Sequence, residues 1–315
     1  MAHYLVTGGA GFIGSHLVES LISHAHRVRV LDNLSTGRPG NLPAQANLII
    51  GDVTDKIAVQ MALDDVDGCF HLAAVASVEL CREDWLRSHM VNLGGTINVF
   101  EEVCRRQKQW GRSICVVYAS SAAVYGSADE IPISEQASPH PANSYGVDKL
   151  GCELHATVAD KVHDLRSVGL RFFNVYGPRQ DPSSPYSGVI SIFCRRISEG
   201  LPVRIHGTGD QLRDFVYVTD AVAALRAAMD RRAAKSDVFN VCTGCGTSIT
   251  RLGEIISEMH ETRFLPEHRP ARPNDVYRSV GDPRRASEML SFEARTPLQS
   301  GLARILDWTG RNAAL

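Results

Sequence analysis

The sequence has no long apolar run, and none of its apolar stretches approaches the roughly 18 residues that a membrane-spanning helix needs. It also has little net charge, −2 over 315 residues. Such a balance supplies no field that would attract nucleic acid or an anionic membrane. The N-terminus begins directly with the strand-like stretch HYLVTGG, without a basic segment, an apolar core and a cleavage site. We therefore expect a cytoplasmic protein without a nucleic-acid or membrane partner.

Paired cysteines are missing as well. The eight cysteines are scattered through apolar segments such as DGCFHLAA and RSICVVYAS, as small buried side chains are in a reducing compartment. Cys242 and Cys245 are the closest pair, and they lack the second pair or the thioredoxin-like context that a metal or redox site requires. We predict no metal site.

What is present is the composition of an ordinary globular protein, 44% hydrophobic and 22% charged. Residues 1–175 alternate short β-rich runs with helical patterns, and Ile13, Leu17 and Leu21 recur every four residues after the first run. Runs separated by helices indicate βαβ units and a parallel sheet with helices on both faces, an α/β fold. The runs lie at residues 4–9, 26–32, 46–53, 68–74, 113–121 and 167–177.

Residues 176–315 differ in composition and pattern, because prolines and glycines are frequent and the helical patterns are shorter. Thr219 and Thr250 are the predicted N-caps of two of these helices. We interpret this part as a smaller α/β portion that faces the substrate over the carboxyl edge of the sheet. The boundary is soft, because the segment DVFNV at 237–241 could return to the main sheet.

A glycine-rich stretch, VTGGAGFIGSHL, follows the first run and opens the first predicted helix. Gly8, Gly11 and Gly14 could form a packing turn, but this strand–turn–helix context is the one that a dinucleotide motif requires. Backbone amides at the helix N-terminus would then point at a pyrophosphate. We favour this phosphate cradle over the packing turn.

Asp32 ends the second run, some distance after the glycines. A carboxylate at this place accepts hydrogen bonds from both hydroxyls of the adenine ribose and repels a 2′-phosphate. We therefore predict NAD as the cofactor, and Arg38 leaves NADP as the alternative.

A second motif is NSYGVDKLGCE, in which Tyr145 and Lys149 are four residues apart and share one face of a helix. A nearby ammonium favours the phenolate form, which lets a tyrosine act as a base. Alone this pattern is common on exposed helices. It gains weight here because it follows the fifth run of a chain that already has a dinucleotide motif.

The third motif is YASSAAVYG, residues 118–126, at the end of the fifth run. An open α/β sheet places its ligands at the carboxyl ends of its strands. Ser120 and Ser121 could therefore donate to a substrate hydroxyl or ketone, although serines at strand ends often only cap a turn.

Together and in this order, these motifs resemble the extended short-chain dehydrogenase/reductase family, and within it the nucleotide-sugar 4-epimerases of the UDP-glucose and UDP-N-acetylglucosamine type. The resemblance covers nearly the whole chain and includes LDNLSTG, GDVTD, RFFNVYGPRQ, RDFVYVTD and FNVCTG. It implies a Rossmann-type doubly wound sheet with an NAD-binding domain at 1–175 and a nucleotide-sugar-binding domain at 176–315.

The resemblance also implies roles for individual residues. Tyr145 matches the catalytic base, Lys149 the residue that holds the nicotinamide ribose, and Ser121 the catalytic hydroxyl at the sugar O4. The cofactor-binding set is Gly8, Gly11, Phe12, Ile13, Gly14, Asp32, Asn33, Asp52, Val53, Ala73, Tyr145 and Lys149. The substrate-binding set is Ser77, Ser121, Asn174, Arg213, Arg272, Asp275 and Ser279, in which the two arginines match groups that bind the diphosphate.

One departure from the family pattern separates its reactions. Members that dehydrate or decarboxylate the sugar carry acidic residues just before the tyrosine of VYG. This chain has Ala122 and Ala123 there, and alanine cannot transfer protons. Those two reactions are therefore disfavoured.

The hexose should depend on Ser279, which matches the residue beside the C2 substituent of the sugar. A tyrosine there confines the family site to glucose and galactose, whereas a serine leaves room for an N-acetyl group. We expect the enzyme to interconvert UDP-N-acetylglucosamine and UDP-N-acetylgalactosamine, with some activity on UDP-glucose and UDP-galactose.

The alternatives are another NAD-dependent nucleotide-sugar enzyme, such as a 4-ketoreductase, or a non-catalytic regulator that senses NAD. The resemblance further implies a homodimer, joined through the helix of residues 86–107 and the helix that carries Tyr145.

Overall fold

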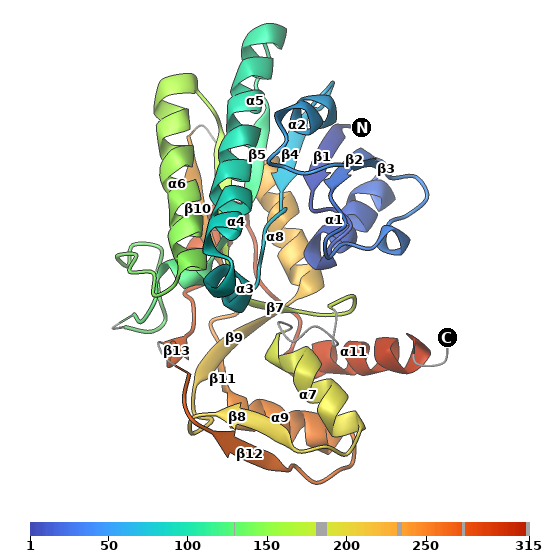
Figure 1. Cartoon of the computed structure of the whole chain (residues 1–315), viewed down its shortest axis with the longest axis vertical. Coiled ribbons are helices and arrows are strands. Elements are labelled where there is room, and N and C mark those ends of the chain that lie inside the picture. The colour runs from blue at the N-terminus through green and yellow to red at the C-terminus, as the bar shows by residue number, and fades with distance from the viewer. Residues whose placement is uncertain (129, 181–187, 232–234, 273–274, 313–315) are drawn as a thin grey trace.

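Seven parallel strands form the main sheet, in the order β10-β6-β5-β4-β1-β2-β3 (Figure 1). The computed structural model describes residues 1–315 except 129, 181–187, 232–234, 273–274 and 313–315. Strand β1 pairs with β2 on one side and with β4 on the other, so the strand order reverses between β1 and β4. At such a reversal the carboxyl ends of the strands open a crevice in which α/β proteins bind ligands. The strands are β1 His3–Thr7, β2 Arg27–Asp32, β3 Asn47–Ile50, β4 Gly68–His71, β5 Cys115–Ser121, β6 Ser167–Phe172 and β10 Asp237–Val241.

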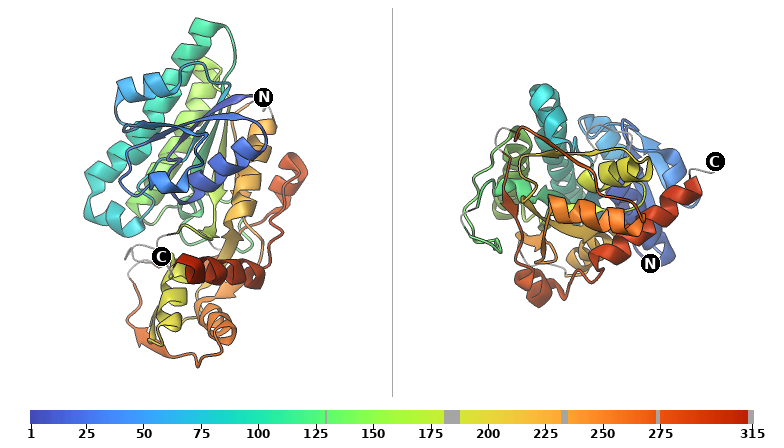
Figure 2. Two further views of the ribbon diagram at one scale, coloured as in Figure 1. Left: turned by 90° about the vertical axis from the view of Figure 1, so that its right-hand side faces the viewer. Right: turned by 90° about the horizontal axis from the view of Figure 1, so that it is seen from below.

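Helices cover both faces of this sheet. Successive side chains of a strand point to opposite faces, so an apolar strand needs a core on each side. Leu5 and Val6 of β1 are both fully buried, and they belong to two different apolar cores. One core includes α1 (Phe12–Ser23), α8 (Val218–Asp230) and α10 (Arg284–Leu290). The other includes α2 (Lys56–Ala62), α5 (Gly95–Trp110) and α6 (Ser144–His163), as Figures 1 and 2 show. The predicted doubly wound α/β fold is confirmed.

A smaller part with its own apolar core lies beyond the carboxyl edge of the sheet, in the lower half of Figure 1. Its central strand is β9, which pairs with β7, β11 and β13, while β8 pairs with β12. The strands are β7 Asn174–Tyr176, β8 Val203–His206, β9 Leu212–Tyr217, β11 Gly246–Ser248, β12 Pro266–Arg269 and β13 Arg278–Ser279. The helices are α7 Val189–Ser198, α9 Ile249–Met259 and α11 Leu298–Asn312.

Short helical segments complete the connections on the main sheet. A π-helical turn joins α4 to α5, so residues 85–110 follow one helical path interrupted by a wider turn. The segments are η1 Pro39–Asn41, α3 Val78–Glu83, α4 Trp85–His89, η2 Met90–Gly94 and η3 Ala122–Val124. In the described part of the chain, no helix is both long enough and apolar enough to cross a bilayer.

The structure differs from the sequence prediction in two places. The single run predicted at 167–177 is two strands, because the chain leaves the main sheet after Phe172 and β7 joins β9 instead. The two threonines are not the N-caps: α8 begins after Tyr217 without a side-chain cap, and Ser248 caps α9 by accepting from the Arg251 amide. The segment 237–241 does return to the main sheet, as β10 beside β6.

Candidate active site

The three glycines between β1 and α1 have different structural tasks. Gly8 has φ +69°, and a Cβ there would lie 2.7 Å from the Ala73 nitrogen, so a side chain is excluded twice. A Cβ at Gly14 would collide with the Gly8 carbonyl, so the absence of a side chain there lets α1 pack tightly on the turn. At Gly11 a Cβ would meet only the Gly8 carbonyl, at 3.3 Å, and the other side is open. Of the three glycines, Gly11 is therefore the one with room beside it for a ligand.

The N-terminus of α1 has no side-chain cap. Gly11 is the N-cap and provides no side-chain hydrogen bond to the first turn. The first amides of an α-helix have no partner within the helix and carry its positive dipole end. Phe12 and Ile13 open this turn, so their amides and the open side of Gly11 fit a pyrophosphate.

Asp32 lies at the carboxyl end of β2, directly beside this turn. Its Oδ2 accepts from the Ala10 amide at 2.9 Å, and its Oδ1 accepts from the Leu34 amide at 2.9 Å. Each oxygen keeps a further lone pair, as a carboxylate needs in order to bind two ribose hydroxyls. Arg38 is exposed, and its amide donates to the Ala10 carbonyl at 3.0 Å.

The remaining predicted cofactor residues lie along the same sheet edge. Asn33 Nδ2 donates to Asp52 Oδ2 at 2.7 Å. Burial raises the pKa of Asp52, but hydrogen bonds from Thr54 and Asn33 outweigh it and bring the pKa below its ordinary value. Val53 is buried, and the Ala73 amide donates to Thr7 Oγ1 at 3.2 Å. Asp52 is thus held as a carboxylate at the carboxyl edge of the sheet.

Tyr145 and Lys149 lie on one face of α6. The helix starts at an Asn143 cap, whose Oδ1 accepts from the Gly146 amide at 2.9 Å. The Lys149 ammonium nitrogen is 5.8 Å from the centroid of the Tyr145 ring. Lys149 is buried, whereas Tyr145 is half-buried, so the phenol is open to a ligand and the amine is sheltered.

His71, at the end of β4, is buried and lies close enough to Lys149 for the ammonium charge to lower its pKa. Burial, assisted by the nearby ammonium, lowers the pKa of His71 to about 3, so the ring is neutral at physiological pH. Its Nδ1 lies 2.8 Å from Thr7 Oγ1 and its Nε2 lies 3.0 Å from Thr96 Oγ1. This neutral network packs β1, β4 and α5 together beneath the crevice.

Ser121 ends β5, and its hydroxyl accepts from the Ala123 amide at 3.1 Å. The first turn of α6 packs against this turn: a Cβ at Gly146 would lie 2.5 Å from the Ala123 carbonyl oxygen. The absence of a side chain at Gly146 therefore brings the segment of Tyr145 onto the segment of Ser121. The three predicted catalytic residues lie on contacting elements.

The predicted substrate residues lie around β9 in the smaller part. Arg213 and Ser279 are register partners on the neighbouring strands β9 and β13. Arg213 Nη2 forms an ion pair with Asp275 Oδ1 at 2.8 Å. Burial lowers the pKa of Arg213 and Asp275 opposes this shift, so an anion close to the guanidinium is favoured.

The other substrate residues are less tightly held. Asn174 is exposed at the start of β7, where it is paired with Phe215 of β9. Arg272 is exposed, and its carbonyl accepts from the Asp275 amide at 3.3 Å. Ser77 caps α3, because its hydroxyl accepts from the Leu80 amide at 3.1 Å. Its hydroxyl proton remains available to a ligand.

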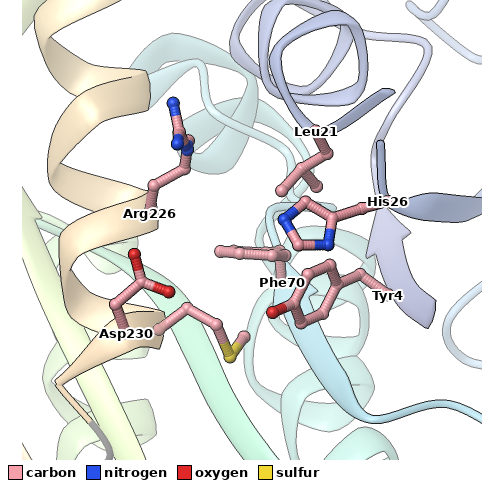
Figure 3. Close-up of a pocket in the computed structure, with 7 residues that line it drawn as sticks. Tyr4, Leu21, His26, Phe70, Arg226 and Asp230 are labelled. Carbon is pink, nitrogen blue, oxygen red and sulfur yellow. The ribbon is translucent and has the colours of Figure 1, made fainter. Parts of the chain in front are cut away.

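Two further observations limit the site. Among the described residues, no group of three or more His, Cys, Asp or Glu side chains could hold a metal ion. A small pocket between α1 and α8 lies at the opposite, amino edge of the sheet, because it is lined by Tyr4 at the start of β1 (Figure 3). None of the predicted site residues lines it, and its lining is Tyr4, Leu21, His26, Phe70, Arg226, Met229 and Asp230.

A buried ionic network beneath Ser121, built on Glu153 and Arg171, was not predicted from the sequence. One signal was available: Glu153 lies four residues after Lys149, on the same helical face. Its partner on β6 could not be read from the spacing.

Comparison with known proteins agrees with this geometry. Residues 4–242 match the model of the NAD dependent epimerase/dehydratase family. The chain is 34% identical to the UDP-glucose 4-epimerase of Mycolicibacterium smegmatis over 310 residues, covering 96% of this chain and 97% of that protein.

Two solved structures share the fold along the full chain. The UDP-glucose 4-epimerase of Thermotoga maritima, solved with UDP-glucose, has a TM-score of 0.93 at 34% identity and covers 99% of both chains. The UDP-N-acetylglucosamine 4-epimerase of Methanobrevibacter ruminantium, solved with UDP-N-acetylmuramic acid, has a TM-score of 0.92 at 33% identity, again over 99% of both chains.

Proposed function

The chain belongs to the NAD dependent epimerase/dehydratase family, and on that premise we propose that it inverts C4 of UDP-N-acetylglucosamine and UDP-N-acetylgalactosamine, with UDP-glucose and UDP-galactose as poorer substrates. It is an NAD-dependent isomerase that acts on a UDP-sugar. The observation that carries the proposal is the contact between the turn after Ser121 and the first turn of α6, in a chain whose glycine turn opens at the same edge of the sheet.

The residues around the crevice fit NAD. The amides at the start of α1 and the open side of Gly11 would hold the pyrophosphate, and Asp32 would hold the adenine ribose. Asn33, Asp52 and Val53 would border the adenosine, and Lys149 would hold the nicotinamide ribose. When bound, NAD supplies the redox chemistry, because it can take a hydride from C4 of the sugar and return it.

The protein supplies the proton chemistry at O4. Tyr145, whose ring centroid lies 5.8 Å from the Lys149 ammonium nitrogen, would accept the proton of the C4 hydroxyl while C4 loses its hydride. The Ser121 hydroxyl donates a hydrogen bond to O4 and holds it in place. The product of this half-reaction is a 4-ketopyranose, which turns over within the site. In the reverse half-reaction Tyr145 returns the proton to O4 as the hydride returns to the opposite face of C4.

The nucleotide must stay bound while the sugar turns over. We assign this task to residues 176–315, in which Arg213 and Arg272 would pair with diphosphate oxygens through their planar guanidinium groups. Asp275, which is paired with Arg213, would orient that guanidinium. Asn174 and Ser77 would contact the nucleotide sugar. Residues 1–175 would hold NAD, together with the returning elements α8 and β10.

The turn after Ser121 disfavours the other reactions of the family. Dehydration and decarboxylation need an acid or a base near C5, whereas Ala122 and Ala123 form this turn and cannot exchange protons. A regulator that only senses NAD would not need a base paired with a buried lysine. Chemistry at C4 is therefore the function that the residues support best.

The choice of hexose is proposed from Ser279. It lies in β13 beside Arg213, so it is close to the group proposed to hold the diphosphate. A serine is much smaller than a tyrosine and leaves space for an acetamido group at C2. Space left unfilled by the smaller sugar costs only about 1–3 kcal/mol of discrimination, so the plain hexoses should also react.

Two properties of the whole molecule complete the proposal. Exposed apolar residues follow one face of α6 at helical spacing, namely Val147, Leu154, Val158 and Val162. Leu86 and Met90 on the neighbouring helical path are exposed as well. We propose a homodimer joined through these faces. All eight cysteines are free thiols, which supports the proposed cytoplasmic location.

The direct test is incubation of purified protein with UDP-N-acetylglucosamine, without added reductant, followed by NMR of the sugar. Formation of UDP-N-acetylgalactosamine is the expected result. A 4-ketoreductase would instead need stoichiometric NADH, and a regulator would leave every UDP-sugar unchanged. Turnover of the plain hexoses alone would overturn the Ser279 argument and leave the 4-epimerase in place.

A further inference from the structure

A buried ion pair lies directly beneath the turn that follows Ser121. Glu153 of α6 and Arg171 of β6 are 6% and 4% exposed. They pair in a bidentate manner, with Arg171 Nη2 to Glu153 Oε2 at 2.6 Å and Nε to Oε1 at 2.8 Å. The Ser120 hydroxyl donates to the same Oε1 at 2.5 Å. One carboxylate thus binds a strand residue and a guanidinium together.

These contacts join the elements that carry the proposed catalytic residues. Glu153 is four residues after Lys149 and eight after Tyr145, so all three lie on one face of α6. Ser120 immediately precedes Ser121, and it is the register partner of Arg171 on β6. The carboxylate therefore links the helix of the base to the strand of the hydroxyl.

The other end of the turn is held by the same guanidinium. Arg171 Nη1 donates to the Tyr125 hydroxyl at 2.8 Å, and that hydroxyl donates to Asn240 Oδ1 at 2.7 Å. Burial raises the pKa of Tyr125 to about 12, so its hydroxyl keeps the proton that it donates. Ser120 and Tyr125 bracket the turn Ala122–Val124, and both are tied to one ion pair.

Stability alone does not account for such a pair. Taking two charges out of water costs free energy that their attraction rarely exceeds, and apolar residues of similar volume often replace a buried pair without loss of stability. What the pair supplies is a defined geometry, because two parallel hydrogen bonds between the carboxylate and the guanidinium allow few arrangements. That geometry fixes β5 relative to α6.

We propose that Glu153 is a positioning residue of the active site, which holds Ser121 in place against Tyr145 and Lys149 through Ser120 and Arg171. This inference rests on the proposed 4-epimerase function and adds a residue that acts through others. Proximity and orientation decide such reactions, and a misplacement of about 1 Å can lower a rate 10²-fold.

The test compares Glu153→Gln with wild type and with the matched control Glu102→Gln. Glu102 is also a buried carboxylate that binds two guanidinium groups, those of Arg105 and Arg106, but it lies on α5 outside the site. Turnover is measured with UDP-N-acetylglucosamine and UDP-glucose and expressed per bound NAD, which counts folded sites. For Glu153→Gln we expect kcat to fall between about tenfold and 100-fold, with KM within about twofold of wild type. Glu102→Gln should retain the wild-type kcat.

Two further variants separate positioning from folding. Ser120→Ala keeps the ion pair and removes only its bond to β5, and it should lower kcat at unchanged KM. Glu153→Asp keeps the charge, and its kcat should lie between those of Glu153→Gln and wild type. If Glu153→Gln does not fold, the kcat of Ser120→Ala decides.

Wild-type kcat in Glu153→Gln or Ser120→Ala, or equal losses in Glu153→Gln and Glu102→Gln, would overturn the positioning role while wild-type turnover still supported the 4-epimerase. A wild-type protein that turns over neither UDP-sugar would remove the proposed function, and the inference with it.

Discussion

Lys149 has the most constrained environment of the proposed catalytic residues. It is buried, its ammonium lies 5.8 Å from the ring centroid of Tyr145, and the neighbouring His71 is kept neutral. A cation beside the ring would stabilise negative charge that develops on the Tyr145 oxygen during the proposed proton transfer. The proposed proton transfer at O4 therefore depends on the pair of Tyr145 and Lys149.

Replacing Tyr145 by phenylalanine removes the proton acceptor at O4 and leaves the ring in place. Turnover should fall by about 10² or more, which is typical of the loss of a positioned acid–base group. NAD released from the denatured variant should match that of wild type, because the glycine turn and Asp32 are untouched. Turnover near the wild-type value would remove Tyr145 from the mechanism.

Replacing Ser279 by tyrosine fills the space proposed for the acetamido group. The variant should lose activity on UDP-N-acetylglucosamine and keep activity on UDP-glucose, whose C2 hydroxyl is smaller. Parallel assays with the two sugars measure this, and UDP-glucose serves as the internal control. Retained turnover of the acetylated sugar would show that Ser279 does not line the C2 pocket.

At the scale of elements, the buried strands were the most predictable part of the fold. β1, β4 and β5 are covered on both faces, so they appear in the sequence as continuous apolar runs between turn signals. The glycine turn and the spacing of Tyr145 and Lys149 were also readable, because each depends on one local segment. Their functional roles remain proposals.

Features that depend on tertiary contacts could not be predicted from the sequence. The run at 167–177 gives no sign that β6 and β7 join different sheets, because only the pairing partners β5 and β9 distinguish them. The ion pair of Glu153 and Arg171 depends on the packing of α6 against β6, which brings together residues 18 positions apart. Tertiary context also displaced the N-cap of α9 from Thr250 to Ser248.

The network of His71 with Thr7 and Thr96 makes the packing of β1, β4 and α5 dependent on pH. The pKa of His71 is about 3 in the folded protein and about 6.5 in an unfolded chain, so between these values only the unfolded state binds the proton. The free energy of unfolding should therefore decrease as the pH falls from 6.5 toward 3, by about 1.4 kcal/mol per pH unit from this group.

Urea denaturation of wild type and His71→Gln across this pH range measures the effect. Glutamine does not titrate, so the variant should show a shallower decrease. Identical pH dependence in the two proteins would mean that His71 is not buried in its neutral form.

At the scale of the whole molecule, the chain crosses between its two parts several times. β10, α8 and α10 come from the second half of the sequence and complete the main sheet and its cover. The proposed NAD and nucleotide-sugar regions are therefore joined by several connections, which keeps them aligned across the crevice. The exposed apolar side chains of α6 belong to a helix that flanks the main sheet, in the upper half of Figure 1.

The proposed dimer is tested by Val158→Asp, which places a charge in the centre of that apolar face. Wild type should have twice the 34.4 kDa chain mass in analytical ultracentrifugation, and the variant should shift toward the chain mass. Ile57→Asp on α2 is the matched control, because Ile57 is also an exposed apolar residue and lies on another helix. A wild-type monomer, or the same shift in both variants, would contradict the proposed interface.

The central claim is that a hydride leaves C4 and returns to the same carbon within one protein molecule. UDP-N-acetylglucosamine that carries deuterium at C4 tests this most directly, with NMR and mass spectrometry of the epimer formed in ordinary water and without added NAD. The account predicts UDP-N-acetylgalactosamine that retains the deuterium at C4, because the transferred hydride is not shared with solvent. An epimer that has lost its deuterium to water would contradict the mechanism, and the absence of any epimer would contradict the function.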